Sequence, residues 1–123
     1  GHYSGLKKRG VNLITKKELM SSPSKVRNIL EGIDTPHMYV SVDMDVGAGN
    51  ALSGVRFTNR RGLNEKQIYR ISELLHERLS GGVNLIGMDL TEFNPRSADP
   101  SGDRTYRIAA NLIRKLCFGL KEI

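Results

Sequence analysis

The sequence predicts an α/β fold in which helices pack on the faces of a mainly parallel sheet. Short apolar stretches typical of strands alternate with amphipathic stretches typical of helices, in the order strand, helix, strand, helix, strand, helix. Such alternation indicates βαβ units, because a connection that crosses back over the sheet makes successive strands parallel. The 123 residues contain no internal repeat and no low-complexity tract. We therefore expect one small domain or part of a larger one.

The first half of the chain predicts two strands and a helix between them. Apolar residues within 10–14 predict a short strand, and Thr15 and Glu18 after it have the spacing of a capping box. A helix is expected at 22–32, where a serine and a proline suit the first turn and a glycine marks the end. The apolar run at 37–45 predicts the second strand.

The second half predicts two helices on either side of a third strand. The first helix is expected at 64–80, with Asn64 and Gln67 at capping-box spacing and two glycines after it. A buried strand follows at 83–90, and Asp103 is the expected cap of the last helix. Apolar residues at helical spacing are expected to face the core: Ile68, Ile71, Leu75 and Leu79 in the first helix, and Ile108, Leu112 and Leu116 in the last.

Composition and charge favour a globular chain over a membrane protein or a nucleic-acid-binding protein. No apolar stretch approaches the roughly 20 residues that a membrane helix needs, and the start does not resemble a signal peptide. The net charge of +6 raises the question of nucleic acid, but the basic residues are dispersed and only 6% of residues are aromatic. Nucleic acid is therefore an unfavoured partner, although a non-catalytic basic binding module stays an alternative.

The single cysteine, Cys117, cannot form an internal disulfide. It lies within an apolar helical pattern, which predicts a buried structural thiol without a catalytic role. A reducing cytoplasm is the default compartment for such a chain.

Two aspartates, Asp43 and Asp45, end the strand expected at 37–45 and open a glycine-rich loop at 46–63. Side chains two residues apart on a strand point to the same face, and ligands of parallel sheets bind at the carboxyl ends of the strands. Adjacent carboxylates repel unless one is protonated or a cation lies between them. Mg²⁺ or Mn²⁺ would suit such oxygen ligands. The alternative is that the aspartates only bind backbone amides of the loop.

A second acidic pair, Asp89 and Glu92, flanks the end of the strand expected at 83–90. If this strand neighbours the one at 37–45, Glu92 would face the same crevice as the first pair. A carboxylate there suits a cationic group such as a guanidinium, which it can bind through two hydrogen bonds. The alternative reading makes Glu92 a solvated loop residue or a helix cap.

Taken together, these motifs resemble those of the ureohydrolase family, which contains arginase, agmatinase and formiminoglutamase. Members of that family show a Ser-x-Asp-x-Asp strand, a loop that ends in Gly-Gly-Leu before a helix, and a strand that ends in Asp-x-x-Glu-x-Asn-Pro. The likeness spans about residues 8–118. The matching residues stand in the same order: Ser41, Asp43, Asp45, Gly62, Leu63, Asp89, Glu92, Asn94 and Pro95.

The resemblance implies a three-layer α/β sandwich with a mainly parallel sheet, of which residues 1–123 would be the C-terminal part of a single arginase-like domain. It implies two Mn²⁺ ions bridged by hydroxide, which attacks the guanidinium carbon of a small substrate such as agmatine or arginine and releases urea. Asp43 and Asp45 would be metal ligands, and Glu92 would hold the substrate. The resemblance also implies a homo-oligomer, a trimer or a hexamer.

Two departures from the family pattern affect these expectations. The loop at 46–63 lacks the usual Asp-Pro and Gly-Thr-Pro, and it places Arg60 and Arg61 just before Gly62. The family's upstream ligand segments, Gly-Asp-His and Asp-x-His-x-Asp, are absent from these residues, so the catalytic residues are unknown. The three histidines do not replace them: His2, His37 and His76. We therefore expect residues 1–123 alone to be inactive and to bind Mn²⁺ weakly at best.

The main alternative is an aspartate-nucleophile phosphatase of the haloacid dehalogenase type. Four apolar or small residues before Asp-x-Asp-x-Val also fit the opening motif of that family, with Asp43 as nucleophile, Asp45 as general acid and Mg²⁺ as cofactor. The residues around Asp89 match its later Gly-Asp motif only loosely, because Met88 is inserted. The ending at 91–95 has no explanation in that reading.

Overall fold

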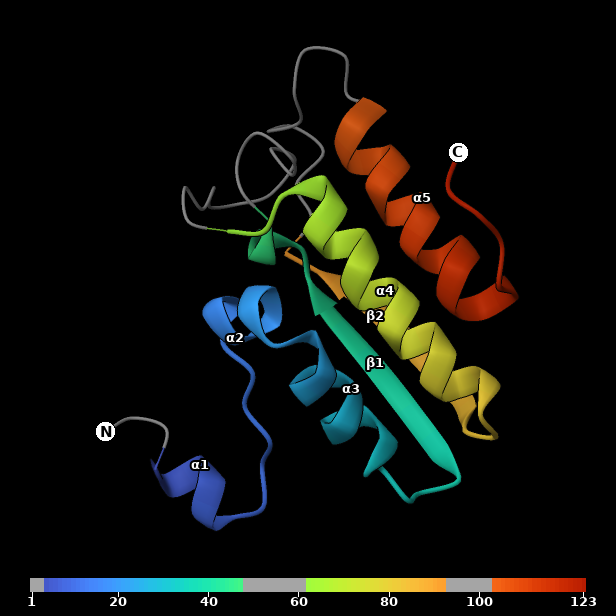
Figure 1. The fold of residues 1–123 in the computed structure, drawn as a ribbon. Coiled ribbons are helices and arrows are strands. Elements are labelled where there is room, and N and C mark those ends of the chain that lie inside the picture. The colour runs from blue at the N-terminus through green and yellow to red at the C-terminus, as the bar shows by residue number, and fades with distance from the viewer. Residues whose placement is uncertain (1–3, 48–61, 93–102) are drawn as a thin grey trace. The chain divides into compact units, whose positions relative to one another are not determined.

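A computed structural model of the chain describes residues 4–47, 62–92 and 103–123. These residues divide into two compact units, the first within Gly1–Asp34 and the second within Thr35–Ile123. The first unit contains three short helices: α1 (Ser4–Lys8), α2 (Lys16–Ser21) and α3 (Pro23–Glu31). The second contains four elements that are labelled in Figure 1: β1 (His37–Asp43), α4 (Glu65–Ser80), β2 (Asn84–Thr91) and α5 (Asp103–Phe118). It also contains η1 (Met44–Val46), a short 3-10 helix that directly follows β1.

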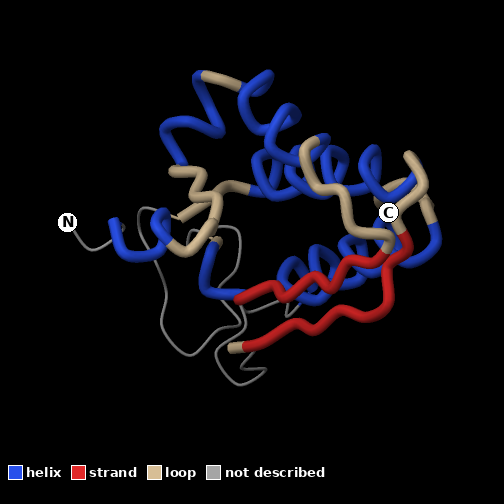
Figure 2. Tube along the Cα trace, turned by 90° about the horizontal axis from the view of Figure 1, so that it is seen from below, coloured by secondary structure: helices blue, strands red, loops and turns tan. Residues whose placement is uncertain are grey.

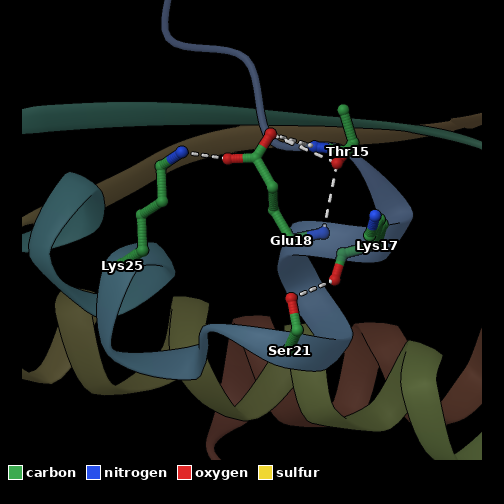
Figure 3. Close-up of polar contacts among 5 residues, drawn as sticks. All are labelled: Thr15, Lys17, Glu18, Ser21 and Lys25. Carbon is green, nitrogen blue, oxygen red and sulfur yellow. Dashed lines mark hydrogen bonds and ion pairs between the residues drawn. The ribbon is translucent and has the colours of Figure 1, made fainter.

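Polar contacts of short range hold the α2–α3 pair of the first unit (Figure 3). The predicted capping box is confirmed: Glu18 N–H donates to Thr15 Oγ1 at 3.1 Å, and Thr15 N–H donates to Glu18 Oε1 at 3.4 Å. The other carboxylate oxygen of Glu18 pairs with Lys25 of α3. This hydrogen bond with Lys25 is the largest cause of the lowered pKa of Glu18. Glu18 therefore both takes part in the cap of α2 and links α2 to α3.

The strand predicted at 10–14 is wrong, because this stretch connects α1 to α2 without forming a strand. Gly10 has a φ of +79°, a left-handed conformation that ends α1. The next residue, Val11, donates its N–H to Leu6 O at 3.1 Å. The N–H of Val11 is thus bonded to α1 and is not available to a strand ladder.

The second unit is built on two parallel strands, as predicted. β1 and β2 are hydrogen-bonded neighbours, and Figure 2 shows them side by side. The register pairs Tyr39 with Gly87 and continues regularly to the pair of Asp43 and Thr91, after an irregularity between Met38 and Tyr39. α4 connects the two strands. This βαβ unit confirms the α/β class, with two strands among the described residues where three were expected.

α4 begins and ends as its sequence predicts. Gln67 N–H donates to Asn64 Oδ1 at 2.9 Å, Asn64 N–H donates to Gln67 Oε1 at 3.0 Å, and the helix ends at Gly81. Its buried face is displaced from the predicted one. The buried residues are Ile68, Ser72 and Leu74, whereas Ile71, Leu75 and Leu79 are half-buried. Burial of the Ser72 hydroxyl is tolerated because it donates to Tyr69 O at 2.7 Å.

α5 packs beside α4 (Figure 1), and its predicted apolar stripe is confirmed. The side chains of Ile108, Leu112 and Leu116 are all buried. Cys117 is exposed, so the prediction of a buried thiol is wrong. It follows the last stripe residue by one position, which turns it about 100° away from the buried face. No helix within 4–47, 62–92 and 103–123 is long and apolar enough to cross a membrane.

Candidate functional site

The first aspartate pair lies where β1 ends, but only one of the two residues is on the strand. Asp43 is the last residue of β1, and its Oδ1 accepts a hydrogen bond from Asp45 N–H at 3.3 Å. This contact caps η1, which bends the chain after the strand, as aspartates often do in turns. The prediction that Asp45 continues the strand is therefore wrong. The amide that Asp43 binds belongs to Asp45 and not to the loop at 46–63, so the alternative reading, in which the aspartates only bind amides of that loop, stays a prediction.

The two carboxylates are nevertheless close enough to influence each other. A side-chain hydrogen bond with Asp43 is the largest cause of the raised pKa of Asp45, followed by desolvation and by the negative charge of Asp43. The charge of Glu92 raises this pKa further. The negative charges of Asp43 and Glu92 thus both act on Asp45, and each makes ionisation of Asp45 more costly.

Glu92 follows directly after β2. The strands are parallel neighbours, and Thr91 pairs with Asp43, so Glu92 stands one residue beyond the level of Asp43. Its φ of +60° is the left-handed conformation that a residue with a side chain rarely adopts. Non-glycine residues in this conformation cluster at functional sites, where the surrounding structure holds them. Because β1 and β2 are neighbours, the condition under which Glu92 could share a crevice with Asp43 is met. Substrate binding by Glu92 stays a prediction.

A second polar cluster joins the two strands just before the acidic residues. Asp89 Oδ2 accepts the Tyr39 hydroxyl at 2.7 Å, and Asp89 Oδ1 accepts the Ser41 hydroxyl at 2.8 Å. The hydrogen bond from Tyr39 is the largest cause of the lowered pKa of Asp89, with Ser41 next. The same bond is the largest cause of the raised pKa of Tyr39. We call Tyr39, Ser41 and Asp89 the hydroxyl–carboxylate cluster.

Sequence reasoning named Ser41 as part of the Ser-x-Asp-x-Asp motif and missed Tyr39 altogether. The sequence signal that could have identified Tyr39 is its spacing of two residues from Ser41, which puts two hydroxyls on one face of β1. Choosing Asp89 as their common acceptor also needed the register between the strands, which pairs Ser41 with Asp89.

The base of the long loop is tied beside the aspartates. Gly47 and Leu63 form a parallel bridge, and Leu63 N–H donates to Val46 O at 2.9 Å. The chain therefore leaves the site after η1 and returns to it just before α4. The residues between these points, including Arg60 and Arg61, lie outside the described residues, as do Asn94 and Pro95.

The oxygen donors of Asp43 and Asp45 fit a hard divalent cation such as Mn²⁺ as part of its ligand set. Across the described ranges, no three His, Cys, Asp or Glu side chains are grouped so as to hold a metal ion. His37 begins β1, at the end opposite the aspartates, and His76 Nε2 lies 3.3 Å from Ser80 Oγ within α4. These two histidines therefore do not complete the site.

Comparison with known proteins places this chain in a family. A model of the family described as "Arginase family" matches residues 1–119. The formimidoylglutamase of Aeromonas hydrophila is 32% identical over 100 residues, which are 77% of this chain and 30% of that protein. Among solved structures, arginase from Bacillus caldovelox superposes with a TM-score of 0.77 at 20% identity, over 100% of this chain and 40% of that one.

A second solved structure, formimidoylglutamase from Bacillus subtilis, superposes with a TM-score of 0.72 at 23% identity, over 91% of this chain and 35% of that one. The chain thus spans about a third of the length of the curated relatives that it matches. These comparisons confirm the arginase-like α/β fold and do not favour the phosphatase alternative. With a family model that matches nearly its whole length, the chain belongs to the arginase family.

Proposed function

We propose that the full-length protein that contains these residues is a manganese-dependent hydrolase of a linear amidine. The observation that supports it best is the placement of three carboxylates at the ends of paired strands: Asp43 and Asp45 where β1 ends, and Glu92, one residue beyond the Thr91 that pairs with Asp43. Cations relieve repulsion between such carboxylates, and the proposed reaction brings cations together there: the Mn²⁺ ions and a protonated amidine.

Asp43 and Asp45 would supply oxygen ligands to the metal. One oxygen of Asp43 accepts the amide N–H of Asp45, which orients the carboxylate. The metal, when bound, supplies a nucleophile at neutral pH by lowering the pKa of water. The remaining ligands would come from other parts of the full-length protein. For this reason we expect residues 1–123 alone to be inactive.

Glu92 would bind the cationic amidine of the substrate. A carboxylate accepts two parallel hydrogen bonds from such a planar group, which fixes the orientation of the carbon to be attacked. The left-handed backbone at Glu92 supports this role, because it places the carboxylate by a conformation that costs energy to hold.

The first substrate to test is formimidoylglutamate, because the curated relatives at 32% identity are formimidoylglutamases. Arginine and agmatine, the guanidino substrates that the sequence motifs first indicated, are the alternatives. Hydrolysis of the C–N bond of any of them gives an amine and an amide, formamide from the first and urea from the other two. The product therefore identifies the substrate class. An oligomer, a trimer or a hexamer, stays part of the proposal.

The test uses the full-length protein and its Asp45→Asn and Glu92→Gln variants. Asp45→Asn should weaken Mn²⁺ binding, measured by calorimetry, by more than the roughly 10- to 100-fold that the loss of a group supporting a ligand costs. Glu92→Gln should keep the Mn²⁺ affinity and lose amide release. Asp34→Asn, an exposed aspartate of the first unit, is the matched control and should change neither. Unchanged Mn²⁺ binding in Asp45→Asn would refute the metal site.

A further inference from the structure

The hydroxyl–carboxylate cluster is a closed arrangement. Tyr39 and Ser41 stand two residues apart on β1, and each donates its hydroxyl to a different oxygen of Asp89 on β2, at 2.7 and 2.8 Å. Hydroxyl bonds to an ionised carboxylate are roughly twice as strong as those between neutral groups. Asp89 is therefore anchored to β1 at two points, although it stands within the Asp-x-x-Glu segment that holds the proposed substrate ligand.

The cluster occupies the part of the sheet where the register has just changed. The pairing of β1 with β2 shifts between Met38 and Tyr39, and Tyr39 belongs to the first pair after the shift. The pairing is then regular up to Asp43 and Thr91. A slip of one residue turns every side chain of a strand to the other face, so a register that has already shifted once needs something to specify it.

Gly87 makes room for this arrangement. A Cβ at Gly87 would lie 2.9 Å from Cε2 and 3.1 Å from Cδ2 of Tyr39, closer than ordinary carbon contacts. The Tyr39 ring thus lies against the backbone of β2, and its hydroxyl reaches Asp89 two residues further along. Any larger residue at 87 would push the ring away from the position that this bond requires.

The position of the cluster relates it to the site. Ser41 is two residues before Asp43, and Asp89 is three residues before Glu92. We propose that Tyr39, Ser41 and Asp89 are positioning residues, which hold the shifted register of β1 and β2 and thereby set where Glu92 stands relative to Asp43 and Asp45. The effect of these positioning residues on catalysis rests on the function proposed above, whereas the register itself is a property of the fold.

The experiment compares three variants of the full-length protein: Tyr39→Phe, Ser41→Ala and Asp89→Asn. Each should lower kcat for amide release by about 10-fold or more and raise KM, because metal ligands and substrate ligand are displaced relative to each other. A merely structural role would lower the melting temperature and leave kcat and KM unchanged well below it. Tyr39→Phe removes a single hydroxyl and is the variant least able to disturb folding.

Thr35→Ala is the matched control. Its hydroxyl donates to His37 O at 3.0 Å, so this variant also loses a hydroxyl hydrogen bond to β1, but at the end before the register shift. It should leave kcat, KM and Mn²⁺ affinity unchanged. The double variant Tyr39→Phe/Ser41→Ala should lose no more than Asp89→Asn, because both hydroxyls act through one carboxylate.

A second readout needs neither metal nor substrate. Amide hydrogen exchange in the metal-free protein should accelerate in the variants within the part of the β1–β2 ladder that follows the shift, 39–43 and 87–91. It should stay unchanged at Asn84, whose N–H donates to Pro36 O at 2.9 Å before the shift. Variants that keep wild-type kcat, KM and exchange would overturn the inference. If wild-type protein neither binds Mn²⁺ nor releases amide, the proposed function fails, and hydrogen exchange alone then decides whether the cluster holds the register.

Discussion

Gly87→Ala should destabilise the protein, although replacing a glycine inside a strand with alanine normally raises the free energy of unfolding. The new Cβ would stand 2.9 and 3.1 Å from two carbons of the Tyr39 ring, where 3.4 Å or more is ordinary. Forcing an extra methyl group into an occupied space costs about 1–3 kcal/mol. Replacing the more flexible glycine stabilises the folded state by about 0.5–1 kcal/mol. The ring is 56% exposed and can rotate away, which keeps the steric cost near the lower end, about 1 kcal/mol. Rotation also breaks the bond to Asp89, at a cost of about 0.5–1.5 kcal/mol, so we expect a net loss of about 1 kcal/mol.

The same substitution should have the opposite sign once the ring is removed. Among the described residues, and apart from its two chain neighbours, only Tyr39 has atoms within 4 Å of the new Cβ. In a Tyr39→Ala background, alanine at 87 therefore meets no described side chain. Gly87→Ala should then stabilise by about 0.5–1 kcal/mol. The two backgrounds, compared by urea unfolding followed by circular dichroism, form a double-mutant cycle.

Gly5→Ala is a matched control, because a Cβ at Gly5 meets no described residue within 4 Å, so its effect should not depend on residue 39. A Gly87→Ala effect of equal size and sign in both backgrounds would refute the packing of the Tyr39 ring against β2. It would also remove one support of the positioning role inferred for Tyr39.

Three further predictions concern other contacts of the structure. Asn111→Ala should cost about 1–3 kcal/mol and accelerate amide exchange at Ile123, because the buried Asn111 Oδ1 accepts the Ile123 N–H at 2.9 Å; protected exchange in the variant would contradict this contact. Asn64→Ala should cost about 0.5–2 kcal/mol in urea unfolding, because it removes the cap of α4; an unchanged unfolding midpoint would show that the cap contributes nothing. The pH dependence of stability should report the bond between Tyr39 and Asp89. The pKa of Asp89 is lowered from 3.8 and that of Tyr39 is raised from 10.0, so the bond contributes fully between these values, and its contribution is lost as the pH falls below 3.8 through the folded-state pKa of Asp89 or rises above 10.0 through that of Tyr39. The melting-temperature difference between wild type and Tyr39→Phe should therefore shrink at both extremes, and a difference that stays constant would contradict the bond.

Several elements could be predicted from the sequence because their causes are local. The capping box at Asn64 and Gln67 and the glycine after the helix set the ends of α4 within a few residues of chain. The stripe of α5 follows from a periodicity of the helix itself. The order of strands and helices was enough to predict parallel pairing, because crossover connections leave little choice of direction.

Other features depend on competing local interactions that a sequence pattern does not resolve. Apolar residues at 10–14 suit a strand, but Val11 donates its N–H to the turn that ends α1, so no ladder forms there. Asp45 was expected on the strand, but the Asp43 side chain caps the amide of Asp45 and starts η1 instead. Cys117 lies in an apolar stretch, yet one position beyond the buried stripe.

The sequence by itself determined the α/β class and the family, and it identified the acidic residues on which the proposed metal and amidine sites rest, since motif spacing and helical periodicity are properties of the chain. Only the tertiary structure decided which of these residues meet. Pairing Asp89 with Tyr39 and Ser41 depends on a register that shifts within β1, and a register is a relation between strands more than 40 residues apart. Such a relation is set by side chains on both strands at once, which is why neither strand's pattern contains it.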